Sequence, residues 1–247
     1  MASAVSHYEN LLAPIYLWMV GGLDAALAAG SADVAELTGA PGYAVDLGAG
    51  FGMHSIPLAR AGFEVLAIDT SAYLLGRLRE HSAGLPVHTV QADLRDFSRH
   101  IAGNADLVLC MGDTLTHLNS TDEVRLLLRD IAACLRAGGV FVATFRDYRQ
   151  LPTGDKRFIP VRSDLRRIHT CFLEQQGEHV IVHDIVQERG ANGWSQQVSS
   201  YQKSRLSPEF VVHAAESAGL AATCRPGPRG MLTVLAHSHP KHSTERP

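Results

Sequence analysis

The residues around position 50 have types and a spacing suited to holding a charged ligand. Residues 45–52 read V-D-L-G-A-G-F-G, so an apolar segment ends at Asp46 and three glycines follow at alternate positions. Glycine can adopt positive φ angles and lets a ligand approach bare backbone. The next apolar segment, 63–68, ends at a second acid, Asp69. This pattern predicts two strands that end in carboxylates, with a tight turn and a helix between them.

The spacing of the glycines bears on the kind of ligand. Gly48, Gly50 and Gly52 give G-x-G-x-G, with an acid two residues before the first glycine. A dinucleotide site would have G-x-G-x-x-G and no acid at that place. A nicotinamide-dependent dehydrogenase is therefore a disfavoured alternative.

Strand and helix patterns alternate along the first part of the chain. The predicted strands are 43–47, 64–68, 87–91, 105–110 and 140–145. The predicted helices are 53–61, 71–81 and 121–136. In the third helix the apolar residues share one face, Ser120 and Glu123 suit a capping box, and Gly138 would end it. Such alternation is typical of a parallel, doubly wound sheet.

Polar features follow the strands at their carboxyl ends. Asp46, Asp69 and Asp93 each stand at or just after the end of a predicted strand, and a polar segment follows Cys110. Ligands of doubly wound sheets bind outside the carboxyl ends of the strands. The convergence of these features at one edge predicts the ligand site better than any one motif does.

The pattern changes in the second part of the chain. Segments 165–176, 179–189 and 194–206 lack helical periodicity and are rich in Val, Ile, Thr, Trp and Tyr, with glycine-containing turns between them. They predict a three-stranded antiparallel insert. Ser207 and Pro208 suit the start of a helix. The sheet would be completed by strands at 221–224 and 231–237.

Composition excludes several classes of protein. The chain has 247 residues, of which 46% are hydrophobic and 19% charged, as in an ordinary globular protein. The net charge of -3, without a Lys/Arg stripe, argues against nucleic acid as a partner. The four cysteines are scattered and form no C-x-x-C pair, so we expect neither a metal site nor disulfides. We expect no signal peptide and no membrane span, and hence a cytoplasmic protein.

With this order of elements, the chain resembles the class I S-adenosylmethionine-dependent methyltransferases that act on small molecules. The resemblance covers about residues 8–236, and 45–69 carry its first two motifs. The second half is most similar to the glycine and sarcosine N-methyltransferases. That closer similarity lies in 110–118, in 145–148 and in the insert that ends with 201–206.

The resemblance implies a Rossmann-like fold: a doubly wound seven-stranded sheet, mostly parallel with an antiparallel last strand, and the antiparallel insert as a cap. It implies a single methyltransferase domain over 1–247. Its expected parts are an N-terminal helical segment (1–40), a cofactor-binding core (41–146), the cap insert (160–206), a final helix and strands (207–237) and a disordered tail (238–247). The oligomeric state stays open.

The resemblance also implies which residues bind S-adenosylmethionine and its product S-adenosylhomocysteine. Asp46 would help to hold the methionine ammonium, Asp69 would accept from both ribose hydroxyls, and Asp93 would accept from the adenine amino group. Leu94 would donate its N–H to the adenine ring, and the Cys110 carbonyl would take the methionine ammonium. All the residues assigned to the cofactor are Tyr16, Asp46, Gly48, Ala49, Gly50, Asp69, Thr70, Asp93, Leu94 and Cys110.

The acceptor site is assigned in the same way. An arginine that matches Arg146 binds the acceptor carboxylate in those relatives, a task that suits a planar guanidinium. Where they usually carry asparagine this chain has Asp113, which favours a cationic or hydroxyl-bearing acceptor or could act as a base. The residues expected to act in catalysis are Asp113, His117 and Arg146; those expected to bind the substrate are Tyr8, Asp113, Arg146 and Tyr148.

Structural alternatives remain open for several of these residues. Asp113 could cap the turn that follows it, His117 could be structural, and Tyr8 and Tyr16 could pack an amphipathic helix. The leading hypothesis is methyl transfer to the nitrogen of a small amine or amino-acid-like acceptor. Transfer to oxygen or sulfur of a small metabolite, and a non-catalytic protein that binds S-adenosylmethionine, are the alternatives.

Overall fold

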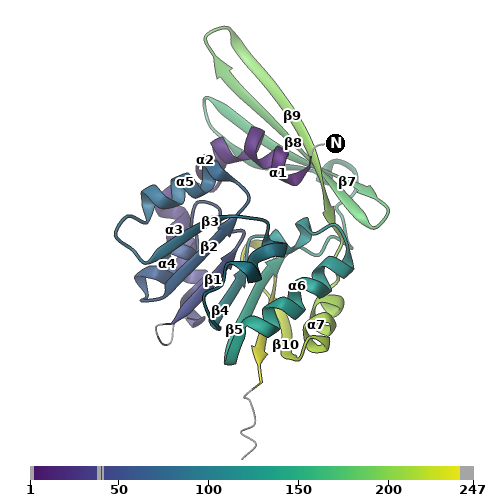
Figure 1. Ribbon diagram of the computed structural model, residues 1–247. Coiled ribbons are helices and arrows are strands. Elements are labelled where there is room, and N and C mark those ends of the chain that lie inside the picture. The colour runs from purple at the N-terminus through teal and green to yellow at the C-terminus, as the bar shows by residue number, and fades with distance from the viewer. Residues whose placement is uncertain (1–2, 38–39, 41, 240–247) are drawn as a thin grey trace, which may run out of the picture.

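A seven-stranded sheet forms the centre of the molecule (Figure 1). The computed structural model describes residues 3–37, 40 and 42–239. The strand order is β10-β11-β5-β4-β1-β2-β3. The strands are β1 (Tyr43–Leu47), β2 (Glu64–Asp69), β3 (Val87–Gln91), β4 (Ala105–Cys110), β5 (Leu135–Phe145), β10 (Leu220–Pro226) and β11 (Leu232–Ser238).

The directions of the strands confirm the predicted sheet. β1 pairs in parallel with β2 and β4, and β2–β3 and β4–β5 are parallel pairs as well. The last strand, β11, runs antiparallel to both of its neighbours, β5 and β10. The central strands are almost continuously apolar because helices cover both faces of the sheet.

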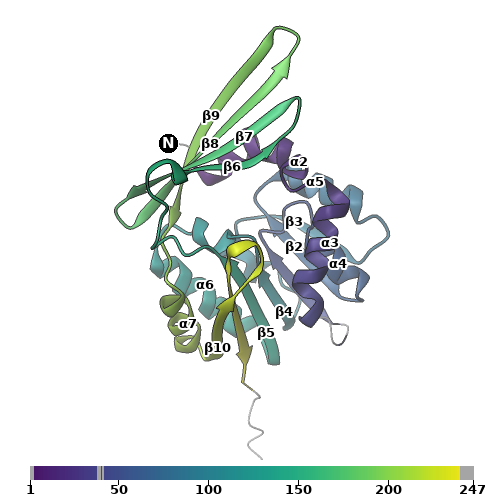
Figure 2. The same cartoon turned by 180° about the vertical axis from the view of Figure 1, so that it is seen from behind.

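Helices pack on the two faces in separate groups (Figures 1 and 2). On one face, α3 (Leu23–Val34), α4 (Ser55–Arg60) and α5 (Ala72–His81) contribute to the cores beside β1 and β2. On the other face, α6 (Thr121–Cys134) and α7 (Pro208–Ser217) share a core with β4 and β5. Serine hydroxyls accept from backbone N–H groups at the start of three of these helices: Ser71 (α5), Ser120 (α6) and Ser207 (α7).

The third predicted helix is shorter than expected, since α6 ends at Cys134 rather than at 136. β5 then begins at Leu135, five residues before the predicted strand, and its first pair with Ala105 is separated from the rest by a register shift. An irregular strand start of this kind is not visible in a pattern of apolar residues.

The N-terminal segment runs between the sheet and the cap (Figure 1). It consists of α1 (Ala4–His7), a π turn (Tyr8–Leu12), a 3₁₀ turn (Ala13–Ile15) and α2 (Tyr16–Met19), followed by α3. Within the described part of the chain, no single helix is long and apolar enough to cross a membrane; one pair, Ala4–Met19 with Leu23–Leu37, would qualify by length and composition together, with a bend of 83°. Of the predicted tail, 240–247 lie outside the described residues.

The cap is an antiparallel sheet that extends beyond the carboxyl edge of the main sheet (Figures 1 and 2). The prediction of three strands was incomplete, because the cap has four. They are β6 (Phe158–Ser163), β7 (Arg167–Gln176), β8 (His179–Gly190) and β9 (Gly193–Ser204), in the order β6-β7-β8-β9. The missed strand, β6, contains Pro160 and has a register shift next to it. Proline argues against a central strand, but it is tolerated at a sheet edge, where β6 lies.

Candidate active site

The glycine turn lies at the end of β1. Gly48 has φ 78° and Gly50 φ 55°, in the region that favours glycine. The N–H groups of Gly48 and Ala49 donate to the carbonyl of Ile68 on β2, at 2.8 and 3.0 Å. A Cβ atom on Gly48 would lie only 2.5 Å from the methyl carbon of Thr114. The turn is therefore tied to β2 and packed closely against the segment after β4.

Two carboxylates flank this turn, as predicted. Asp69 accepts from the N–H of Gly50 and from the N–H of Ser71, each at 2.8 Å. Burial raises the pKa of the Asp69 carboxyl even though these two hydrogen bonds oppose the shift. Asp46 is buried and accepts from the hydroxyl of Ser55 at 2.6 Å, and burial raises its pKa as well. Asp69 therefore holds the backbone of the turn, and Asp46 holds Ser55 at the start of α4.

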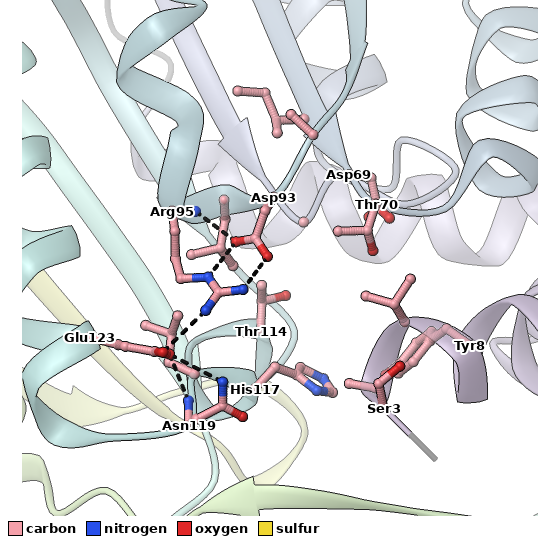
Figure 3. Close-up of a pocket in the computed structure, with 17 residues that line it drawn as sticks. Ser3, Tyr8, Asp69, Thr70, Asp93, Arg95, Thr114, His117, Asn119 and Glu123 are labelled. Atoms are coloured by element: carbon pink, nitrogen blue, oxygen red, sulfur yellow. Dashed lines mark hydrogen bonds and ion pairs between the residues drawn. The ribbon is translucent and has the colours of Figure 1, made fainter.

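A cavity of about 230 Å³ opens beside the turn (Figure 3). Five residues assigned to the cofactor line it: Gly48, Asp69, Thr70, Asp93 and Leu94. Figure 3 shows Tyr8 and Ser3 on the N-terminal segment facing this group across the cavity. The structure thus brings the ends of β1, β2 and β3 together with the start of the chain.

The other five residues assigned to the cofactor lie elsewhere. Tyr16 lines a second cavity, described below. Asp46, Ala49, Gly50 and Cys110 are not among the residues that line either of these cavities, and Cys110 is fully buried at the end of β4. Their roles toward the cofactor stay predictions.

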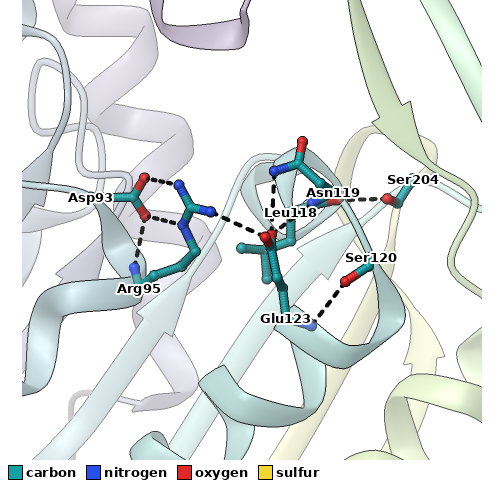
Figure 4. A network of polar contacts seen from close by, with 7 residues as sticks. All are labelled: Asp93, Arg95, Leu118, Asn119, Ser120, Glu123 and Ser204. Atoms are coloured by element: carbon teal, nitrogen blue, oxygen red, sulfur yellow. Dashed lines mark hydrogen bonds and ion pairs between the residues drawn. The ribbon is translucent and has the colours of Figure 1, made fainter.

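Asp93 is held by a neighbouring arginine (Figure 4). The carboxylate accepts from the backbone N–H and Nε of Arg95, both at 2.9 Å, and from Nη2 at 2.7 Å. These hydrogen bonds keep the pKa of the Asp93 carboxyl below its usual value. Asp93 is therefore a fully ionised acceptor in the wall of the cavity. The sequence prediction placed Asp93 here but did not include Arg95.

His117 lies where the N-terminal segment meets the cap. Its ring stacks on Tyr201 at 5.5 Å between centroids and meets the ring of Tyr8 edge-on at 5.4 Å. Burial, together with the charge of Lys203, lowers the pKa of His117 well below its usual value. Its Nδ1 is buried and has no hydrogen-bond partner among the described residues. At neutral pH this ring is therefore neutral.

A second cavity, of about 820 Å³, lies under the cap. The residues predicted for the acceptor that line it are Tyr8, Asp113, Arg146 and Tyr148. His117 lines the first cavity instead, and Tyr8 lines both. Tyr8 therefore marks the boundary between the two cavities.

Asp113 occupies a strained backbone position, and its carboxylate has three partners. Its φ of 74° is left-handed, which is uncommon for a residue other than glycine. The carboxylate accepts from the backbone N–H of Arg146 at 2.9 Å and from the hydroxyl of Tyr148 at 2.6 Å, and it forms an ion pair with Lys203. The side chain makes no capping hydrogen bond to the turn that follows it, so the structural role left open by the sequence is not the one observed. Its three contacts favour a fixed hydrogen-bond acceptor over a free base.

Lys203 is a residue that sequence reasoning missed. It lies on β9, two residues after Tyr201 and therefore on the same face of the cap sheet. Only 6% of its side chain is exposed. A lysine two residues after a tyrosine in an alternating strand was the available signal. Its ammonium also lies 5.9 Å from the ring centroids of Tyr148 and Tyr201.

The guanidinium of Arg146 is exposed at the rim of the second cavity. Its only described side-chain hydrogen bond runs from Nη1 to the carbonyl of Arg229, at 3.4 Å. Most of its donors are therefore available to a ligand. Arg229 itself is fixed by Asp33, at 2.6 and 3.2 Å.

A buried cluster that the sequence did not predict joins the N-terminal segment to the cap. The Asp184 carboxylate contacts His7 Nε2 at 2.9 Å and His169 Nε2 at 2.7 Å. His7 Nδ1 lies 2.8 Å from the hydroxyl of Ser199. Within residues 3–37, 40 and 42–239, no group of three His, Cys, Asp or Glu side chains is arranged to hold a metal ion.

Known proteins are similar to this chain in sequence and in fold. A family model described as a methyltransferase domain matches residues 44–139. A glycine/sarcosine N-methyltransferase of Parasynechococcus marenigrum (strain WH8102) is 29% identical over 198 residues, which is 70% of this chain and 70% of that protein.

Two solved structures show the same fold. The CcbJ methyltransferase from Streptomyces caelestis has a TM-score of 0.77 at 22% identity, covering 94% of this chain and 98% of that one. CalS10 of Micromonospora echinaspora, an amino pentose methyltransferase solved with S-adenosylmethionine, has a TM-score of 0.71 at 20% identity, covering 91% and 95%.

The sequence matches and the fold together define the class. This chain is a class I S-adenosylmethionine-dependent methyltransferase. The residues around the first cavity fit the cofactor, because Gly48 leaves bare backbone and two carboxylates, Asp69 and Asp93, can accept from hydroxyl and amino groups.

Proposed function

We propose that this enzyme methylates the amine nitrogen of a small acceptor. S-adenosylmethionine, when bound, supplies a methyl group on a sulfonium sulfur. Asp69 binds the ribose hydroxyls and Asp93 the adenine amino group, while the acceptor occupies the cavity under the cap. Tyr8 lines both cavities, which supports a transfer point beside its ring. Alignment of the two reactants then supplies most of the acceleration.

The observation that carries the choice of nitrogen is the state of the Asp113 carboxylate. It already accepts from three donors, on Arg146, Tyr148 and Lys203, so it is a poor base. His117 is a weak base because its pKa is well below the usual value. A hydroxyl acceptor needs its proton removed, whereas an amine that arrives neutral is already a nucleophile.

The reaction then needs little proton chemistry from the protein. A bond forms between the acceptor nitrogen and the methyl carbon as the bond from that carbon to sulfur breaks. The methylated nitrogen carries one positive charge and later releases its proton. Burial raises the pKa of Tyr8 and Tyr201 well above the usual value, so both hydroxyls stay protonated. His117, neutral between these two rings, can accept a hydrogen bond from the amine N–H.

The cavity under the cap suits two kinds of acceptor. Arg146 at the rim suits a carboxylate, which supports an amino-acid-like amine as in the glycine/sarcosine relative. The volume of about 820 Å³ is that of a pocket for a drug-sized ligand, which supports a larger amine such as an amino sugar. We favour an amine that is larger than glycine and carries an anionic or hydroxyl group.

A methyl-transfer screen tests this function. The full chain is incubated with radiolabelled S-adenosylmethionine and separate pools of amino acids, amino sugars, simple amines, phenols, carboxylates and thiols. Release of S-adenosylhomocysteine on an amine pool supports the proposal. Turnover on phenols, carboxylates or thiols alone would replace nitrogen by oxygen or sulfur. Cofactor binding without turnover on any pool would favour the non-catalytic alternative.

A further inference from the structure

Arg95 lies in the wall of the first cavity, which we call the cofactor cavity. Its side chain contacts both carboxylate oxygens of Asp93. Three N–H groups of Arg95 reach the Asp93 carboxylate: its backbone N–H and Nε contact Oδ1, and Nη2 contacts Oδ2. The two side-chain contacts form the paired, planar arrangement that a guanidinium makes with a carboxylate. Figure 4 shows both contacts.

The far end of Arg95 is fixed as well. Its Nη1 donates to Oε1 of Glu123 on α6, at 3.1 Å. The other oxygen of Glu123 accepts from the backbone N–H of Asn119 at 2.9 Å (Figures 3 and 4). The guanidinium is therefore clamped between two acids. Both acids and the arginine line the cofactor cavity.

The clamp limits what Asp93 can bind. An ionised carboxylate has about four lone-pair positions, and Arg95 occupies three of them. One position remains for a ligand. Because the carboxylate is acceptor-only, that position takes a donor such as an amino group and repels an oxo group. The adenine ring of the cofactor carries an amino group at its 6-position.

We infer that Arg95 is a positioning residue for the cofactor: it holds Asp93 so that its remaining lone pair faces the adenine amino group. This rests on the cofactor roles in the proposed function but not on the identity of the acceptor. The Asp93 side chain is 33% exposed, so without Arg95 it can turn to solvent. The enzyme would then lose its preference for adenine rather than its fold.

The chain offers a matched control on the same 3₁₀ turn, Leu94–Arg99. Arg99 also pairs with an acid, Asp96, at 3.0 Å. Its side chain is 76% exposed, and neither residue lines the cavity. Arg99→Met therefore removes an ion pair of the same kind without touching the clamp.

Calorimetric binding of the product and of one product analogue tests the inference. The full chain and its variants are titrated with S-adenosylhomocysteine and with S-inosylhomocysteine, in which an oxo group replaces the adenine amino group. The variants are Arg95→Met, Arg95→Lys, Asp93→Ala, the double variant of Arg95→Met with Asp93→Ala, and Arg99→Met. The thermal midpoint of each variant is recorded to confirm that it is folded.

We expect the wild type and Arg99→Met to prefer the adenine ligand. Arg95→Met should lose about tenfold in affinity for S-adenosylhomocysteine, with little change for S-inosylhomocysteine. Arg95→Lys should behave similarly, because lysine keeps the charge but not the paired contact. The double variant should match Asp93→Ala, since Arg95 acts through Asp93.

Equal weakening of both ligands by Arg95→Met would mean a structural role and would overturn the inference. An unchanged ligand preference in Asp93→Ala would overturn it too, by removing Asp93 from the adenine. Neither result bears on whether an amine is methylated, so failure here is distinguishable from failure of the proposed acceptor.

Discussion

The ammonium of Lys203 forms an ion pair with the carboxylate of Asp113, and this contact joins the last strand of the cap to the segment that follows β4. Each of these side chains is only 6% exposed. The next residue along the cap, Ser204, donates its hydroxyl to the carbonyl of Leu118 at 2.6 Å. An ion pair and a hydrogen bond therefore attach the cap to the segment between β4 and α6.

Loss of Lys203 should be costly for stability. Lys203→Met leaves the Asp113 carboxylate buried without its cation, which typically costs about 3–5 kcal/mol. We expect the free energy of unfolding, measured in urea, to fall by an amount of that order. The exposed Lys156 offers a control, and Lys156→Met should unfold like the wild type.

The double variant of Lys203→Met with Asp113→Asn separates charge from packing. It removes both charges, so most of the lost stability should return. If the double variant is as unstable as Lys203→Met, the ion pair is not the source of the effect.

Asp184 should make the fold sensitive to acid. Burial by itself raises the pKa of this carboxyl, but the hydrogen bonds from His169 and His7 outweigh burial and leave it below its usual value. A lowered pKa in the folded state adds stability above the unfolded value of about 3.9, and this stability is lost as the pH falls through the folded value.

Urea unfolding at pH 5 and pH 3 measures this effect. The wild type should lose stability over that interval, and Asp184→Asn should lose less, because it has no proton to take up at this position. Equal losses in the two proteins would show that other carboxylates cause the acid sensitivity.

The sequence predicted those parts of the fold that repeat a local pattern. Apolar strands that end in acids, with a glycine turn after the first, predicted that Asp69 and Asp93 converge at one edge of the sheet, and both line the first cavity. Their roles toward the cofactor stay predictions. β6 was missed because Pro160 interrupts its pattern, and its position at the sheet edge is a property of the tertiary structure.

The charged contacts of the site could not be predicted in the same way. Lys203 and Asp113 are 90 residues apart, so nothing local couples them. His7 meets Asp184 across 177 residues. Arg95 is only two residues from Asp93, but its pairing depends on a side-chain conformation that Glu123 of α6 helps to fix. The partner of a long charged side chain depends on tertiary packing, and the periodicity of the sequence does not predict that packing.

Asp69 is predicted to contribute directly to cofactor affinity. Asp69→Ala removes the proposed acceptor for two ribose hydroxyls, and it also frees the N–H of Gly50 that Asp69 holds. We expect the affinity for S-adenosylhomocysteine to weaken by about 1–3 kcal/mol, measured by calorimetry. Asp96→Ala, at a residue that does not line the cavity, should bind as tightly as the wild type. Unchanged affinity in Asp69→Ala would remove the ribose role.

Arg146 should matter for the acceptor and not for the cofactor. Its guanidinium is exposed and makes one long contact, with the carbonyl of Arg229 at 3.4 Å, so the fold has little need of it. Arg146→Ala should raise the KM for a carboxylate-bearing amine found in the screen by about tenfold, as expected for a lost charge-assisted contact. Its thermal midpoint and its affinity for S-adenosylhomocysteine should stay at the wild-type values.

A second acceptor, an amine without a carboxylate, tests whether Arg146 binds the carboxylate of the acceptor. If the guanidinium binds a carboxylate, the same variant should change the KM for an amine without a carboxylate much less. Arg225→Ala is the matched control, because Arg225 is a half-exposed arginine paired with Glu36 and lies outside both cavities. A loss of cofactor affinity in Arg146→Ala, with the acceptor KM unchanged, would instead place this arginine in the cofactor site.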